Sequence, residues 1–117
     1  MATKFTLNPK PTFKLSVSIP RPGEDDGVVT LIVRHKTRKQ LKDMEDNLKR
    51  AAELVDGSAD QVDAPLNYLA EIIESWNIDS EYNRDNLALL LENYPRAFDS
   101  IVSAYTKELY AVREKNS

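Results

Sequence analysis

An alternating segment close to the N-terminus constrains the fold more than any other feature. Between Thr12 and Ile19 the sequence reads T-F-K-L-S-V-S-I, and every second residue is apolar, which is typical of a strand with one buried face. The stretch from Pro20 to Gly27 holds two prolines and two glycines and predicts an exposed turn. The β-branched run from Val28 to Arg34 predicts a second, antiparallel strand. Because an isolated hairpin is marginally stable in water, its apolar face must lie against other elements.

Two helices are predicted in the middle of the chain. The sequence T-R-K-Q at Thr37–Gln40 matches a capping box, after which apolar residues recur at three- and four-residue steps until Gly57 ends the helix. Asp63 is a suitable N-cap for a second helix with Pro65 in its first turn. Its apolar stripe runs to Trp76, which favours a core position for this side chain over an interface position.

Two further helices are predicted in the C-terminal third. Asn83 can cap the third helix, which should end near Tyr94 because Pro95 disfavours helical backbone in the residue before it. The fourth begins with this proline in its first turn, and its apolar face is Phe98, Ile101, Val102, Tyr105, Leu109 and Val112. The fold class we expect is mainly α within α+β: an N-terminal antiparallel β-hairpin followed by about four helices that form a small bundle.

The length of 117 residues predicts one hydrophobic core and a single domain at 1–117. Within it we expect the β-hairpin at 12–35, the helical part at 37–113, and flexible termini at 1–10 and 114–117. No apolar run approaches the ~20 residues that span a bilayer, and the N-terminus lacks the apolar run of a signal peptide. We therefore expect no membrane association.

The charge is unevenly distributed along the chain. The formal net charge is -3, which argues against nucleic-acid binding, but residues 34–50 hold seven basic and three acidic side chains, whereas residues 53–99 hold two basic and eleven acidic ones. Both regions can be ordinary solvated helix faces. Alternatively, they form complementary poles that guide head-to-tail association between copies.

The residues that catalysis or metal binding would need are scarce. His35 is the single histidine and the chain has no cysteine, so neither a zinc site nor a catalytic triad can be assembled. The segment that begins at Asp79 resembles a calcium loop, but its sixth position is Arg84 where glycine is required. Only three glycines are present, and none forms a phosphate-binding loop. We therefore expect no enzyme activity, no catalytic residue, no cofactor and no metal.

Protein binding is the activity that remains, and three groups of candidates follow. Aromatic and arginine side chains are common interface anchors, and the outer edges of a hairpin offer unpaired main-chain groups to another strand. Each side chain taken singly can also be an ordinary surface residue. The nominated contact positions are Arg34, Lys36, Arg38 and Lys39 on the basic segment, with Tyr68, Tyr82 and Tyr110 as exposed aromatics.

Four stretches, spread over most of the chain, carry a family resemblance. They read F-T-L-N-P-K-P-T-F-K at Phe5–Lys14, I-I-E-S-W-N-I at Ile72–Ile78, L-L-E-N-Y-P at Leu90–Pro95 and A-Y-T-K-E-L at Ala104–Leu109. In these residues the chain resembles the tail assembly chaperones of long-tailed, lambda-like bacteriophages. The family supplies no catalytic residue.

The resemblance implies a function and partners. Such chaperones coat the aggregation-prone tape measure protein until the tail tube polymerises around it, so the implied partners are the tape measure protein and the tail tube protein. The implied location is the host cytoplasm and not the mature virion. This chain would be the short product of a gene that also yields a C-terminally extended form by frameshifting, and we expect a homo-oligomer that binds neither nucleic acid nor membrane.

Two alternatives stay open from the sequence. One is a small structural head or tail completion protein of the virion, which would share the size and the lack of chemistry. The other is a nucleic-acid-binding regulator that uses the basic side chains of the first helix, namely Arg38, Lys39, Lys42, Lys49 and Arg50.

Overall fold

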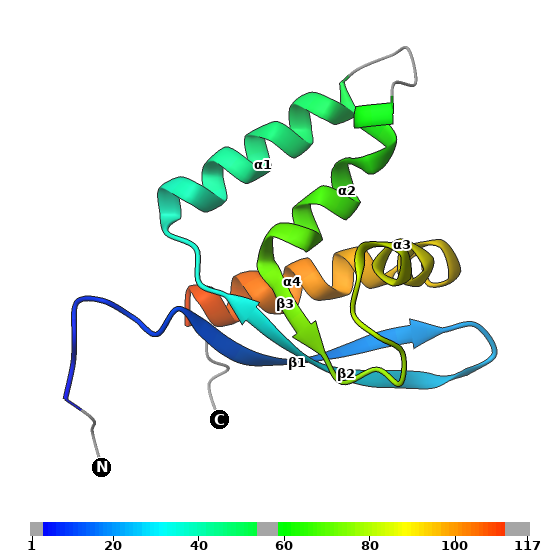
Figure 1. Cartoon of the computed structure of the whole chain (residues 1–117), viewed down its shortest axis with the longest axis horizontal. Helices are drawn as coiled ribbons and strands as arrows, with labels where there is room; N and C mark the ends of the chain where they lie inside the picture. Colours follow the sequence, from blue (N-terminus) through cyan, green and yellow to red (C-terminus); the bar gives the residue numbers. More distant parts are fainter. Residues whose placement is uncertain (1–3, 54–58, 112–117) are drawn as a thin grey trace, which may run out of the picture.

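This computed structural model describes residues 4–53 and 59–111. They contain a three-stranded antiparallel sheet and four helices (Figure 1). The strand order is β1-β2-β3, and the helices lie on one side of the sheet (Figure 1). The predicted hairpin and the α+β class are confirmed, but the small helical bundle is not. The elements are β1 (Thr12–Arg21), β2 (Glu24–Arg34), α1 (Arg38–Ala52), α2 (Ala59–Ile72), β3 (Ile73–Trp76), α3 (Arg84–Asn93) and α4 (Ala97–Leu109).

The hairpin turn is shorter than the sequence predicted. Pairing continues to Arg21 and Glu24, so only Pro22 and Gly23 connect the strands, and the φ of 71° at Gly23 is one that glycine adopts without strain. Pro20, expected in the turn, lies inside β1 at a register shift. A proline is tolerated there because β1 is an edge strand, where a missing N–H need not interrupt a ladder. The predicted loop at residues 20–27 was therefore wrong.

The third strand was missed by the sequence analysis. The apolar stripe of the second helix was expected to run to Trp76, but α2 ends at Ile72 and the chain continues without a loop as β3. Its residues pair with Leu31–Val33 on the outer side of β2. The helix also starts earlier than expected, at Ala59, so the position assigned as its cap, Asp63, and the proline expected in its first turn lie inside it.

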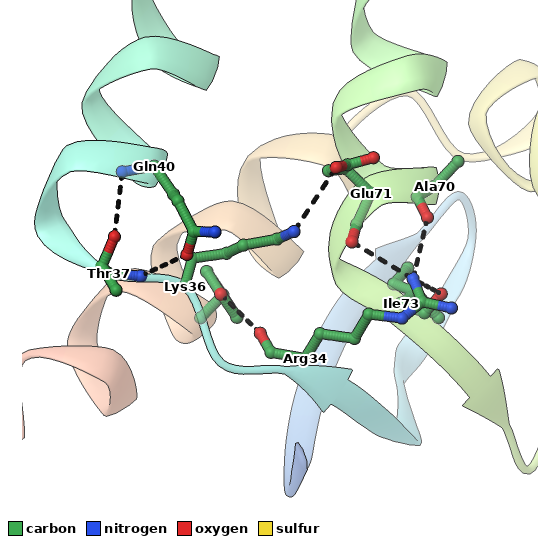
Figure 2. Close-up of polar contacts among 8 residues, drawn as sticks. Arg34, Lys36, Thr37, Gln40, Ala70, Glu71 and Ile73 are labelled. Carbon is green, nitrogen blue, oxygen red and sulfur yellow. Dashed lines mark hydrogen bonds and ion pairs between the residues drawn. The ribbon is translucent and has the colours of Figure 1, made fainter. Parts of the chain in front are cut away.

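The N-terminal caps of α1 and α3 are those predicted. The Gln40 amide donates to Thr37 Oγ1 at 3.1 Å, and the Thr37 amide donates to Gln40 Oε1 at 2.9 Å, which completes the capping box (Figure 2). Asn83 accepts from the Asn86 amide at 2.8 Å, and α3 ends before Tyr94 as expected. Pro95, however, lies just before α4 and outside its first turn. The predicted helix stop at Gly57, Val112 and the tail at 114–117 fall outside the described residues.

The core lies between the inner face of the sheet and the helices. Alternation along β1 buries Leu15, Val17 and Ile19 and leaves Lys14, Ser16 and Ser18 exposed, as the pattern predicted. Helix α4 lies against β1, and its Tyr105 ring stacks on Phe13 with centroids 5.9 Å apart. The remaining buried apolar side chains among the described residues are Leu31, Val33, Leu41, Tyr68, Leu69, Ile72, Ile73, Leu87, Ala97 and Ile101. Trp76 is half-buried against this core.

Candidate protein-binding site

Arg34 is partly buried, and its side chain contacts the end of α2. Its Nη1 donates to the main-chain oxygens of Ala70, Glu71 and Ile73 at 3.3, 3.2 and 3.2 Å (Figure 2). These oxygens lie where α2 passes into β3, at the helix end where carbonyls lack intrahelical partners and a positive charge is favourable. Arg34 therefore caps α2 from β2, and its side chain is engaged in fixing the junction between the two elements.

The other three basic candidates lie in two kinds of surroundings. Lys36 forms an ion pair with Glu71 at 3.4 Å, and its side chain is 14% exposed (Figure 2). Arg38 and Lys39 lie exposed on the first turn of α1. Within the predicted basic segment, Arg34 and Lys36 are therefore engaged by acceptors of the chain itself, whereas Arg38 and Lys39 are exposed. A binding role for any of the four stays a prediction.

Of the three tyrosines expected to be exposed, one is buried and one is half-buried. Tyr68 is 5% exposed and packs edge-on against Phe98, with ring centroids 5.8 Å apart. The Tyr82 hydroxyl donates to the Ile73 oxygen at 3.0 Å, and burial raises the pKa of Tyr82 while the Arg34 charge lowers it. Tyr110 is half exposed, as expected. Their assignment as contact residues is otherwise untested.

The Tyr68 hydroxyl is a buried polar group that has no hydrogen-bond partner among the described residues. Burial raises the pKa of Tyr68 to about 12, and the charges of Glu45 and Tyr110 act in the same direction. The hydroxyl therefore stays protonated at neutral pH. Such an unpaired group in a folded protein carries a desolvation cost that needs an explanation.

An open groove lies between α1 and α2, with a volume of about 460 Å³. These two helices project from the sheet as a pair, and α1 contacts no described helix or strand except α2 (Figure 1). One side of α1 therefore remains uncovered. The apolar lining is Met44, Leu48, Ala51, Ala64 and Tyr68, and the polar lining is Asn47, Asn67 and Glu71.

The apolar residues that α1 contributes to this lining lie on the stripe that the three- and four-residue steps predicted. Met44 and Leu48 follow the helical period, so the pattern identified their face of the helix correctly. Both are only half-buried, and α2 contributes the small side chain of Ala64 to the opposite side of the groove. Small residues opposite large ones were the available signal that the space is unfilled.

A second groove, the α2–α3–α4 groove, has a volume of about 420 Å³. Its lining is mostly apolar and includes two prolines, Pro65 and Pro95. Two carboxylates, Glu92 and Asp99, also border it. The other lining residues are Leu66, Ala88, Leu91 and Phe98.

One of the two hairpin edges is closed. β3 pairs with β2 at Leu31–Val33, and Asn77 extends this contact by one residue, since its amide donates to the Thr30 oxygen at 3.1 Å and its side-chain oxygen accepts from the Thr30 amide at 2.9 Å. On its other side β1 has no strand partner within the described residues. Of the two hairpin strands, β1 therefore keeps an open edge along this length, and β3 forms the other edge of the sheet.

Residues 4–53 and 59–111 contain no cluster of three or more His, Cys, Asp or Glu side chains that could hold a metal ion. None of their helices has both the length and the apolar character that a membrane crossing requires.

Comparison with known proteins identifies the family. Neither curated proteins nor solved structures gave a match. A protein-family model described as phage tail assembly chaperone matches residues 1–116, which is nearly the whole chain. This agrees with the resemblance in the Ile72–Ile78 and Leu90–Pro95 stretches, which form β3 with its flanks and the end of α3. The chain therefore belongs to the phage tail assembly chaperone family.

Proposed function

We propose that this chain binds the tape measure protein of its phage during tail assembly and prevents it from aggregating. The proposal rests on one observation beyond family membership, the uncovered apolar side of α1 facing the α1–α2 groove. A tape measure protein is expected to present long apolar helices. An apolar groove between two helices is a common receptor for such a helix.

The lining of the groove suits this partner. Met44 supplies a flexible, polarisable side chain that adapts to different apolar surfaces, so one groove can accept successive segments of a long helix. The polar groups of Asn47, Asn67 and Glu71 can orient the bound segment. We propose binding without covalent chemistry, and no cofactor takes part.

Coverage of a long partner requires many copies. The unpaired edge of β1 offers main-chain donors and acceptors to a neighbouring copy, and weak contacts to one filament add through avidity. We propose that the chaperone acts as a homo-oligomer in the host cytoplasm, joined by its C-terminally extended form, contacts the tail tube protein when the tube forms, and leaves the finished virion. Binding of nucleic acid or membrane is not part of this function.

Co-expression with the tape measure gene of the same phage tests the proposal. We expect the tape measure protein to become soluble and to co-purify with the chaperone. If it stays insoluble with the wild-type chaperone, the proposed function is wrong.

A matched pair of variants locates the site. Leu48→Glu places a charge in the groove and should abolish co-purification, because the charge would be desolvated by an apolar helix. Lys49→Glu places a glutamate at the neighbouring exposed position, and this variant should still co-purify with the tape measure protein. Circular dichroism checks that both variants fold. Equal co-purification of the two would exclude the groove as the binding site.

A further inference from the structure

We infer that the N-terminal arm, residues 4–11, of one copy docks into the α2–α3–α4 groove of a second copy. This inference rests on the self-association in the proposed function and specifies the contact that produces it. The arm carries the two most exposed large apolar side chains of the described residues, Phe5 at 87% and Leu7 at 92%. Only one residue separates these two side chains, so both can enter one apolar surface.

The sequence of the arm keeps it away from its own groove. Asn8-Pro9-Lys10-Pro11 contains two prolines, which fix their own φ and disfavour helical backbone in the residue before each. The oxygen of Pro11 accepts from the His35 amide at 2.8 Å, so the base of the arm is fixed to the end of β2. The arm therefore leaves the sheet at the start of β1 and does not fold back onto the helices (Figure 1).

The groove matches the arm in polarity and charge. Its apolar lining includes Leu66, Leu91 and Phe98, which suits Phe5 and Leu7. Glu92 and Asp99 border it and have no ion-pair partner among the described residues. The arm has Lys4 and Lys10 on either side of its apolar pair and no acidic residue. Complementary charges of this kind set the orientation of a docked segment.

The arm and the groove lie toward opposite ends of the molecule. Phe13, at the start of β1, stacks on Tyr105 in the second half of α4, whereas the groove contains Phe98 and Asp99 from its first turn. Figure 1 shows the arm (blue) leaving at one end of the long axis and α3 at the other. A contact between two different surfaces placed in this way joins copies head to tail, and the product is an open chain or a ring.

Cysteine cross-linking tests the contact, because the chain has no cysteine of its own. Leu7→Cys chaperone is mixed with Ala88→Cys chaperone that carries a larger C-terminal tag, and a short bismaleimide is added. We expect a mixed dimer. Val28→Cys, 70% exposed on the hairpin, replaces Ala88→Cys as the control and should give far less. Equal yields with the two partners would overturn the inference, and so would a doubly substituted chain that cross-links only within itself.

Charge reversal gives a second, independent readout. Lys4→Glu with Lys10→Glu should weaken self-association measured by sedimentation, and Glu92→Lys with Asp99→Lys in the same chain should restore it. Leu7→Asp should weaken it about tenfold or more, since one apolar anchor is lost from the contact. Thr6→Asp, at the neighbouring exposed position, serves as its control. Absence of rescue, or equal effects of the two aspartates, would contradict the arm–groove contact.

The inference and the proposed function can fail separately. If Leu7→Asp chaperone no longer self-associates but still solubilises the tape measure protein, the contact is confirmed and binding of the tape measure protein does not depend on it. If the Leu7→Cys and Ala88→Cys copies cross-link but the tape measure protein stays insoluble with the wild-type chaperone, the contact stands and the proposed function is wrong.

Discussion

The hydroxyl of Tyr105 donates to the main-chain oxygen of Arg34 at 2.7 Å and so joins α4 to the last residue of β2, 71 positions earlier in the chain. The side chain of the same arginine caps α2. One residue thus connects the sheet to two helices through different groups. Damage to either contact should therefore reduce the stability of the whole fold.

Tyr105→Phe removes the first of these contacts and little else. The phenyl ring can still stack on Phe13, so the expected loss is that of one buried hydrogen bond, about 1 kcal/mol of unfolding free energy. Denaturation in urea measures it. A change close to zero would mean that the Arg34 oxygen finds another donor in the variant.

Arg34→Met removes the cap of α2 and leaves three carbonyls without their donor. Hydrogen bonds to a charged group contribute about 1.5–3 kcal/mol, and we expect a loss in this range. Arg38→Met, on the exposed first turn of α1, is the matched control and should change the unfolding free energy by less than about 0.5 kcal/mol. Equal effects of the two substitutions would show that the cap contributes nothing specific.

Tyr68→Phe should stabilise the isolated chaperone. The hydroxyl is buried without a partner in the described residues, and its removal relieves a desolvation cost of about 1 kcal/mol. Thermal denaturation of the wild type and the variant measures the difference. A loss of stability would reveal a hydrogen bond of this hydroxyl beyond residues 4–53 and 59–111.

Stability should decline in alkali because of two buried tyrosines. Burial raises the pKa of Tyr68 to about 12 and also raises that of Tyr105, whereas an unfolded tyrosine ionises near 10. The folded state thus retains its phenolic protons while the unfolded state releases them. The contribution of these two tyrosines to the free energy of unfolding is complete below about pH 10 and is lost as pH rises toward 12 and above.

Melting temperatures between pH 9 and 12, with tyrosinate absorbance recorded in parallel, check this decline. Tyr68→Phe should lose part of the pH dependence, because it removes one of the groups whose pKa differs between the two states. An unchanged slope in this variant would assign the decline to other groups.

Local signals in the sequence predicted the elements whose causes are local. The capping side chains of Thr37 and Asn83 lie within three residues of the amides they satisfy, and both helix starts were found. The strand pattern of β1 was also found, since the buried and exposed residues alternate within the segment itself. The helix end at Tyr94 follows from the adjacent proline.

Features that depend on distant residues were missed. β3 exists because Leu31–Val33 offers it an edge about 40 positions earlier in the chain, and no periodicity within Ile73–Trp76 reports that edge. The prediction that Tyr68 is exposed was wrong, because Phe98 and the other residues around it come from separate elements. The α1–α2 groove was missed for the same reason, because whether a helix face is covered depends on the shape of its neighbour.

Helix α2 passes directly into β3, so no residue lies between a helix and a strand whose side chains repeat with different periods. An inserted or deleted residue at Ile72 or Ile73 would have nowhere to be absorbed, and it would turn the inward side chains of the strand outward. Chain length at this junction should consequently be invariant in functional variants. Substitutions can change which side chains contact a partner, but the number of residues that link α2 to the sheet should stay constant.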